Sequence, residues 1–214
     1  MTERPGTITP HTKAIALVFS FAALAFLNSC ANPVNAKTAQ IYYRSGTQAE
    51  NSGNLPLARR NFERAAINAA IGNLGPFAEA SYLYEQSRVE GRLGNTAKAE
   101  AGFTRVANLL DQAGSPGSSL VAPNFTEHAR LLHDTEQHSK AVPVFAKADQ
   151  ALRQVDAQGT DPIGYADFLH DYARSLSKSG QKRRAATIRT TAATLRAQNP
   201  GKKTTFQRKR YPRS

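Results

Sequence analysis

Histidines and carboxylates are the first side chains of this sequence to consider for catalysis or metal binding. Three histidines, His128, His133 and His138, recur every five residues. Two ligands on one helix face stand four residues apart, so a spacing of five scatters these imidazoles around a helix and past its end. We therefore interpret His133 and His138 as ordinary polar residues and expect His128 at a packing position. Glu127 and Asp134 do not indicate acid–base catalysis, because any polar helical protein offers such a pair.

The sequence also lacks the short motifs that signal common catalytic sites. It contains no glycine-rich phosphate loop, no Gly-x-Ser-x-Gly, no His-Glu-x-x-His and no Cys-x-x-Cys. At 214 residues and 40% hydrophobic composition, the chain is long enough for one domain with a sizeable core. We expect a binding or structural protein, not an enzyme, with no cofactor, no metal ion and no small-molecule substrate.

The elements that would position functional side chains are helices arranged in hairpins. Between Tyr42 and Ala65, apolar and small residues lie three and four positions apart on both sides of Gly53-Asn54. This is the spacing of two amphipathic helices joined by a tight turn. Gly53 suits the left-handed end of one helix, and Asn54 suits the cap of the next. The same reasoning predicts helices over residues 38–51, 55–71, 76–92 and 96–112, and later hairpins that open at Asn124 and at Asp161-Pro162.

Four copies of this hairpin pattern follow one another along the chain. The first small residue of each second helix is Ala58, Ala99, Ala141 or Ala185. These alanines are separated by 41, 42 and 44 residues. An aromatic residue follows four positions later in three copies, as Phe62, Phe103 and Phe145, and Arg189 replaces it in the last.

The pattern resembles the tetratricopeptide repeat, a helical hairpin of about 34 residues whose small residues let two helices approach closely. The resemblance implies an all-α fold, a right-handed superhelix of about four hairpins over residues 38–198. The longer spacing in this chain indicates longer helices or longer connections. An alanine-rich helical bundle with coincidental spacing is the alternative. Either way the pattern indicates a scaffold and specifies no chemistry.

An apolar run precedes the repeats. Ala14 to Leu27 is 14 residues long, and at 1.5 Å per residue it would span about 21 Å, less than the roughly 30 Å of a bilayer core. A secretory signal peptide therefore fits better than a membrane-spanning helix.

The run ends in Leu27-Asn28-Ser29-Cys30, which contains the only cysteine of the sequence. This ending resembles the lipobox of bacterial lipoproteins, whose cysteine receives a diacylglycerol and, after cleavage, an acyl chain such as palmitate on its amino group. The resemblance implies a signal peptide at 1–29, lipidation at Cys30 and a tether at 30–37. Ala31, where lipoproteins of the inner membrane typically carry Asp, favours a periplasm-facing outer-membrane location. An ordinary signal cut after Ala36 is the alternative.

Positive charge is concentrated at the C-terminal end. The chain has 28 basic and 16 acidic residues, and no acidic residue follows Asp171, whereas thirteen basic ones do. Residues 199–214 are rich in cations and poor in apolar side chains, which predicts a disordered basic tail, because such a segment buries too little surface to offset the entropy of ordering. The cations of this tail are Lys202, Lys203, Arg208, Lys209, Arg210 and Arg213.

In proteins that the repeat resembles, the first helices of the hairpins line a concave groove. Carried over position by position, the resemblance places three arginines side by side in that groove, with further cations one turn away. Arginine matches carboxylate groups with a planar fork of donors, and tyrosine adds a flat surface with a polar tip. The alternative is a solvated helix face. The candidate groove residues are Tyr43, Tyr84, Arg88, Arg92, Arg130, His170, Arg174 and Lys178.

Two functions remain open from the sequence. The first is a lipid-anchored envelope scaffold that binds an envelope protein through a peptide or acidic segment in the basic groove. The second is a structural envelope protein whose basic C-terminal end associates with anionic membrane or cell-wall polymer. Thirteen cations would also bind nucleic acid non-specifically, but an exported protein seldom meets it, so we expect no nucleic-acid partner.

Overall fold

The computed structural model describes residues 31–114, 117, 119–204 and 208–213. The predicted signal peptide and Cys30 lie outside these described residues, so the structure does not bear on them. Within the described part of the chain, no helix is long and apolar enough to cross a membrane.

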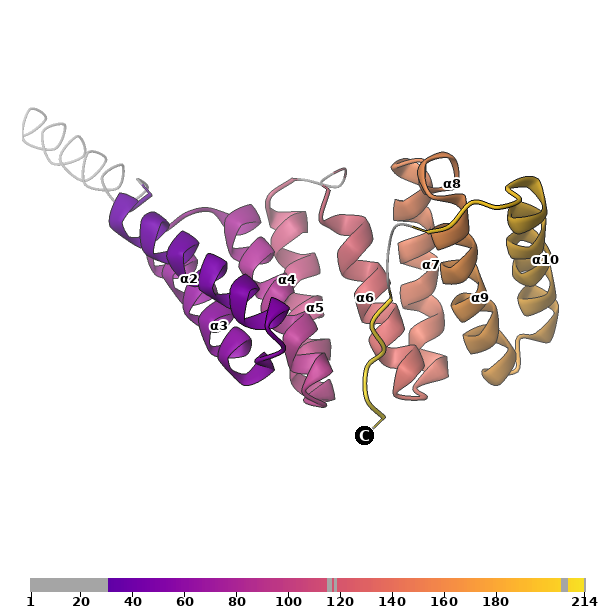
Figure 1. Cartoon of the computed structure of the whole chain (residues 1–214), viewed down its shortest axis with the longest axis horizontal. Coiled ribbons are helices and arrows are strands. Elements are labelled where there is room, and N and C mark those ends of the chain that lie inside the picture. The colour runs from indigo at the N-terminus through magenta and orange to yellow at the C-terminus, as the bar shows by residue number, and fades with distance from the viewer. Residues whose placement is uncertain (1–30, 115–116, 118, 205–207, 214) are drawn as a thin grey trace, which may run out of the picture.

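The described residues fold into helices without strands, as the repeat pattern predicts. Figure 1 shows the helices standing side by side along the long axis of the molecule. The helices are α2 (Pro33–Asn51), α3 (Leu55–Ile71), α4 (Pro76–Arg92), α5 (Thr96–Gln112), α6 (Val121–Asp134), α7 (His138–Gln154), α8 (Ala157–Thr160), α9 (Pro162–Lys178) and α10 (Lys182–Gln198).

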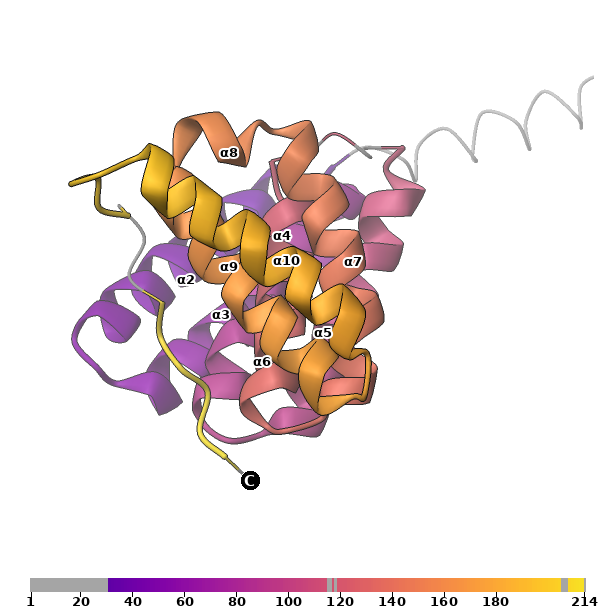
Figure 2. The same ribbon diagram turned by 90° about the vertical axis from the view of Figure 1, so that its right-hand side faces the viewer.

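Neighbouring helices pair as four hairpins, α2–α3, α4–α5, α6–α7 and α9–α10. Successive hairpins stack because α3 contacts α4, α5 contacts α6 and α7 contacts α9. The view along the stack in Figure 2 has α10 in front, at the C-terminal end of the superhelix. The predicted all-α superhelix of about four hairpins is therefore confirmed.

The repeated small and aromatic residues form the core of each hairpin. The four alanines that open the second helices are at most 1% exposed, and the three phenylalanines that follow them are equally buried. The packing between the helices of a pair is close, since a Cβ atom added at Gly46 would lie 2.8 Å from the ring of Phe62. Arg189, which replaces phenylalanine in the last hairpin, is exposed on α10. A charged residue is tolerated there because no further hairpin covers this helix.

Two predicted helix caps are present. The Asn54 side chain accepts a hydrogen bond from the backbone N–H of Leu57 at 3.1 Å, at the start of α3. The Asp161 side chain accepts one from the N–H of Gly164 at 2.8 Å, at the start of α9. Each cap satisfies a backbone donor that the first turn of a helix leaves unpaired.

The predicted cap at Asn124 is wrong. Helix α6 begins three residues earlier, at Val121, so Asn124 lies inside the helix. Its side chain is fully buried and donates a hydrogen bond to the backbone carbonyl of Phe103 at 3.1 Å. The side chain thus links α6 to α5, because a buried amide is stabilised when it finds a backbone acceptor in the neighbouring hairpin.

The C-terminal segment differs from the disordered tail that we expected over 199–214. Residues 208–213 lie in extended conformation against the hairpins, and Tyr211 is only 5% exposed. In Figure 1 the segment leaves the end of α10, returns across the stack and ends beside α6. The composition of the tail predicted disorder because the tail has few apolar side chains of its own to bury. The carboxylates and apolar residues that hold residues 208–213 belong to the folded hairpins instead.

Candidate functional site

The first helices of the hairpins, α2, α4, α6 and α9, share one face of the stack, which we call the groove. Cavities open along this face between side chains of α4, α6 and α9 and of the C-terminal segment. We call residues 208–213 the docked segment, because they occupy the groove. The contacts of the docked segment define the candidate site.

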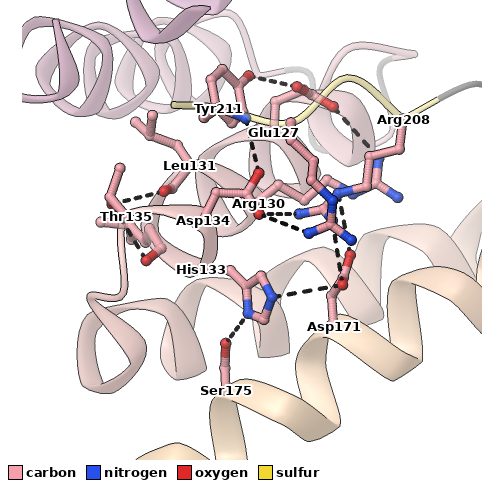
Figure 3. A network of polar contacts seen from close by, with 12 residues as sticks. Glu127, Arg130, Leu131, His133, Asp134, Thr135, Asp171, Ser175, Arg208 and Tyr211 are labelled. Atoms are coloured by element: carbon pink, nitrogen blue, oxygen red, sulfur yellow. Dashed lines mark hydrogen bonds and ion pairs between the residues drawn. The ribbon is translucent and has the colours of Figure 1, made fainter. Parts of the chain in front are cut away.

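Arg208 is held between two carboxylates of neighbouring hairpins (Figure 3). Its Nη2 donates to Oδ1 of Asp134 on α6 at 2.7 Å. Its Nε lies 3.3 Å from Oδ2 of Asp171 on α9. Both carboxylates are buried, with Asp134 8% and Asp171 5% exposed. One guanidinium therefore joins the third hairpin to the fourth through charge-assisted contacts.

Tyr211 is the second anchor of the docked segment. Its backbone N–H donates to Oδ2 of Asp134 at 3.0 Å, and its hydroxyl donates to Oε2 of Glu127 at 2.5 Å. Its ring packs in a cluster with Phe103 and Leu131. The seat for the ring requires a glycine, because a Cβ added at Gly91 on α4 would lie 2.6 Å from a ring carbon. Burial, followed by the negative charge of Glu127, raises the pKa of the Tyr211 hydroxyl well above its usual value, so it stays protonated and can donate.

A buried histidine supports the carboxylate on α9. Nδ1 of His133 lies 2.8 Å from the Ser175 hydroxyl, and Nε2 lies 3.7 Å from Oδ1 of Asp171. Burial, followed by the charge of Arg208, lowers the pKa of His133 to about 4. The imidazole is therefore neutral near pH 7. We had interpreted His133 as an ordinary polar residue. It is instead a buried hydrogen-bonding residue, because α9 packs over the helix position that it occupies.

The charge of Arg208 affects the pKa of the buried Asp171 carboxyl group. Burial raises the pKa of Asp171, and the charge of Arg208 opposes that rise. A buried carboxylate without a nearby cation would favour its protonated form. The cation of the docked segment therefore helps to keep the Asp171 carboxylate ionised.

The predicted groove residues of the N-terminal hairpins are already paired with carboxylates of the scaffold. Nη2 of Arg88 lies 2.9 Å from Oε1 of Glu50 on α2, and Arg88 also pairs with Glu85 on its own helix. Arg92 pairs with the same Glu50 oxygen. These two arginines are thus close together, as predicted, but their donors are engaged by Glu50 and Glu85 within the scaffold.

The two predicted groove tyrosines are half-buried and make ring contacts. The ring centroid of Tyr43 lies 5.9 Å from that of Phe62. Tyr84 lies 6.2 Å from Phe103, and the Arg88 guanidinium carbon lies 5.8 Å above the Tyr84 ring. Burial raises the pKa of Tyr84 strongly, so its hydroxyl remains protonated. Both tyrosines therefore contribute to packing beneath the groove.

The remaining predicted groove residues separate into two groups. Arg130 is 5% exposed, and its Nη1 lies 3.5 Å from Oε1 of Glu127. His170, Arg174 and Lys178 on α9 are exposed. The structure therefore does not form one open row of three arginines, because Arg88 and Arg130 are drawn into scaffold pairs while Arg174 faces solvent.

The basic tail residues also separate by role. Arg208 is half-buried, whereas the cations exposed to solvent are Lys202, Lys203, Lys209, Arg210 and Arg213. Arg210 approaches Asp134 at 3.5 Å but keeps a largely exposed side chain. Among the six predicted tail cations, Arg208 alone has its side chain enclosed by the groove.

The acidic residues of the site were not identified as site residues from the sequence. From the sequence we considered Glu127 and Asp134 only as carboxylates that do not indicate acid–base catalysis. The sequence offered one clue to the role of each of Glu127, Asp171 and Tyr211. Glu127 stands three residues before Arg130, Asp171 is the last acidic residue, and Tyr211 is an aromatic residue within a run of cations.

A cavity of about 400 Å³ includes Arg130 and Glu127, the acceptor of the Tyr211 hydroxyl, in its lining. The rest of its wall is largely apolar and comes from α4, α6, α7, α8, α9 and the loops next to them. The apolar wall residues include Ala122, Pro123, Leu152, Tyr165 and Phe168. Among the described residues, no group of three His, Cys, Asp or Glu side chains is placed to hold a metal ion. The site is therefore suited to binding an extended segment with a side chain inserted beside it.

Two solved structures share this architecture. BtubC (BKLC) from P. vanneervenii superposes with a TM-score of 0.68 and 16% identity, over 80% of this chain and 68% of that one. A repeat protein from Podosopora anserina with nearly identical TPR-like repeats of the kinesin light chain type gives a TM-score of 0.61 and 14% identity, over 75% of each chain. No protein-family model and no curated protein matches the sequence. The structural likeness shows that the chain has a tetratricopeptide-like fold.

Proposed function

We propose that this protein is a lipid-anchored scaffold of the bacterial envelope that binds an extended segment of a partner protein in its groove. Tetratricopeptide-like folds commonly serve as protein-interaction scaffolds. The observation that carries the proposal is that the groove already holds an extended polypeptide, residues 208–213, through Asp134, Asp171 and Glu127. The proposed role is binding, without catalysis, cofactor or small-molecule substrate.

The groove binds its occupant through both backbone and side chains. Asp134 accepts hydrogen bonds from a backbone N–H and from a guanidinium, so it binds the main chain of the occupant as well as a positive charge. Next to Asp134, an apolar cluster that includes Phe103 and Leu131 holds the ring of Tyr211. Peptide-binding grooves commonly combine main-chain hydrogen bonds with pockets for a few side chains. An acidic partner segment, which the arginine pattern suggested, would have to displace Glu50 from Arg88 and Arg92.

The proposed anchor is a lipid on Cys30, which lies outside the described residues. Each buried methylene contributes about 0.8 kcal/mol, so two or more acyl chains give stable membrane attachment. The Cys30→Ser variant should leave the membrane fraction and no longer incorporate labelled fatty acid. Continued labelling of that variant would refute the anchor and leave the groove proposal untouched.

Site-specific photo-crosslinking in intact envelopes tests the scaffold role. A crosslinking residue at His170, which is exposed in the groove, should capture a discrete envelope protein. The matched control is the same residue at Thr104, which is exposed on α5 away from the docked segment. Equal capture from both positions, or capture of no protein from His170, would count against a partner-binding groove.

A second candidate function rests on the exposed cations at the C-terminal end. Arg183, Arg184 and Arg189 of α10 are exposed, and no acidic residue follows Asp171 to offset them. We propose as the alternative that this end associates with anionic membrane or cell-wall polymer. Association with vesicles containing phosphatidylglycerol should then fall steeply between 50 and 200 mM salt, because added salt shortens the distance over which the charges attract. Vesicle binding that does not change with salt concentration would exclude this alternative.

A further inference from the structure

We infer that the C-terminal half of the groove is a receptor for an extended partner segment that carries an arginine three residues before a tyrosine, and that the chain's own Arg208-Lys209-Arg210-Tyr211 occupies it as an intramolecular competitor. This inference rests on the proposed scaffold function and specifies the chemistry of its partner.

Charge complementarity selects a cationic occupant. The buried oxygens that face the docked segment belong to Asp134, Asp171 and Glu127, and each has a partner atom on Arg208 or Tyr211. With the segment in place, the Asp134 and Asp171 carboxylates beside it are at most 8% exposed. Burying a carboxylate without a compensating cation is costly. An incoming segment must therefore supply a cation at the place of Arg208.

The spacing within the segment is set by the scaffold. Asp134 binds both the Arg208 guanidinium and the Tyr211 backbone N–H, through its two separate oxygens. Glu127, on the same helix two turns earlier, accepts the Tyr211 hydroxyl. One helix thereby fixes the distance between the guanidinium and the phenol. The intervening Lys209 and Arg210 are exposed, and Arg210 only approaches Asp134 at 3.5 Å, so the groove specifies mainly the two ends of the four-residue motif.

The aromatic position favours tyrosine over an aliphatic residue. The seat above Gly91 has no room for a Cβ atom beneath the ring, which implies a flat group there. The ring contacts Leu131 and Phe103, while the hydroxyl reaches a carboxylate. A phenylalanine would fill the seat but leave the Glu127 oxygen without that donor. The seat therefore selects for both the flat ring and the polar hydroxyl of tyrosine.

The docked segment is suited to exchange because its hold on the groove is local. Its enclosed side chains are Arg208 and Tyr211, whereas Arg210 and Arg213 keep exposed side chains and approach Asp134 and Glu136 at 3.5 Å. A tethered segment competes with a free ligand at an effective concentration of the order of millimolar. A partner segment must therefore bind better than the tail alone, or be brought to high local concentration on the membrane.

The test uses a labelled hexapeptide with the sequence of residues 208–213 and the purified protein. In the full-length Arg208→Ala/Tyr211→Ala variant, whose own segment has lost both anchors, fluorescence anisotropy should show saturable binding of the peptide. Wild-type protein should bind the same peptide about tenfold or more weakly, because the tethered segment competes. A peptide with alanine in place of its arginine at 208 and its tyrosine at 211 should not bind either protein.

Two further variants identify the binding site. Adding Asp134→Asn to the tail-weakened protein should weaken peptide binding about tenfold or more, since charge-assisted hydrogen bonds to a buried group are lost. Adding Asp111→Asn, the same change at an exposed position on α5, should leave binding unchanged. Equal effects of the two changes would overturn the assignment of the site.

The remaining outcomes separate this inference from the proposed function. If a peptide with glutamates in place of the cations binds the tail-weakened protein and the basic peptide does not, the groove is a peptide receptor of the opposite chemistry. If neither binds, residues 208–213 are a structural strut that closes the groove, and the receptor is refuted. Capture of a protein by crosslinking at His170 bears on the scaffold role alone, so the two proposals fail independently.

Discussion

The two halves of the groove both place guanidinium groups against buried carboxylates, but they recruit the guanidinium from different parts of the chain. In the N-terminal half, Glu50 on α2 receives Arg88 and Arg92 from α4. In the C-terminal half, Asp134 and Asp171 receive Arg208 from the docked segment. The arginine side chains are similarly enclosed, at 23%, 17% and 15% exposure.

Burial therefore does not distinguish the two halves, and chain connectivity does. Arg88 and Arg92 belong to a packed helix, so their backbones stay beside Glu50 as long as the two hairpins stay together. Arg208 belongs to an extended segment that can leave the groove while the helices stay in place. The same chemistry thus stabilises the scaffold in one half and makes an exchangeable contact in the other.

The largest expected effect comes from the core beneath both halves. Phe103 is fully buried, packs beside Tyr84 of the N-terminal half and stacks on His128 of the C-terminal half. The Phe103→Ala variant should lose about 3–5 kcal/mol of unfolding free energy, because it leaves a cavity in a close-packed core. Urea unfolding measures the loss. A change below about 1 kcal/mol would mean that the hairpins do not depend on this junction.

Removing the shared carboxylate of the N-terminal half should destabilise the whole fold. The Glu50→Gln variant leaves Arg92 without its ion-pair partner and Arg88 with Glu85 only. We expect a loss of about 2 kcal/mol, below the value for a fully buried pair because the arginines are partly exposed. Urea unfolding should show this loss while amide exchange of Tyr211 stays slow. Faster exchange at Tyr211 without global destabilisation would contradict the comparison.

Acid should weaken the C-terminal half first. Burial lowers the pKa of His128 and of His133 to about 4, whereas the unfolded chain titrates near 6.5. Between these values the unfolded state binds more protons, so unfolding free energy falls as pH is lowered from about 6.5 to about 4, and this contribution is fully present above that range. The described residues before α6 contain no histidine.

The acid effect is measured by urea unfolding at pH 7 and pH 5, where most carboxylates are still ionised. The His133→Gln variant should show a smaller loss of stability between the two pH values than the wild type. Exchange of amides in α6 and α9 should rise before that of amides in α2 and α3. An identical pH dependence in variant and wild type would exclude His133 as a titrating group.

Removing the central carboxylate of the C-terminal half should release the docked segment. In the Asp134→Asn variant, Arg208 can move into water, so the expected loss of global stability is only about 1 kcal/mol. Exchange of the Tyr211 amide should accelerate strongly, because that N–H donates to Asp134. Asp111→Asn serves as the control. A loss as large as that of Glu50→Gln would show that the segment is an integral part of the fold.

The smallest expected effect is at the tyrosine seat. In the Gly91→Ala variant the new methyl group would collide with the Tyr211 ring, and alanine favours the helix by about 1 kcal/mol over glycine. Global stability should therefore stay equal or rise slightly while exchange of the Tyr211 amide becomes faster. These opposite changes separate the segment from its scaffold. Unchanged exchange at Tyr211 would mean that the ring adapts without leaving.

Local sequence patterns predicted the hairpins closely. The bounds of α3, α4 and α5 agree with the predicted ranges, and the caps Asn54 and Asp161 form as expected. Helix α2 instead begins at Pro33, within the stretch 30–37 that we expected to be a tether, because Asn32 caps it. These features depend on residues near one another in the chain. The failed cap at Asn124 shows the limit, because its amide bonds to the carbonyl of Phe103, 21 residues earlier, instead of starting a helix.

The candidate site was predicted less well because its partners are distant in sequence. The groove positions were found from the repeat register, yet which charges remain open depends on pairs such as Arg88 with Glu50, 38 residues apart. The contact between Tyr211 and Glu127 spans 84 residues. No periodicity in a single sequence connects such residues.

The sequence by itself determined the helices, their pairing in hairpins and the burial of the repeated alanines and phenylalanines, because these follow from the spacing of apolar and small side chains. The tertiary structure alone decided the polarity of the groove and the fate of the basic tail. Stacking the hairpins brings Asp134 and Asp171 within reach of one guanidinium, and carboxylates covered in this way stabilise the cation that pairs with them. The segment 208–213 follows the last helix and reaches that place, so a stretch whose composition predicts disorder becomes the occupant of the groove.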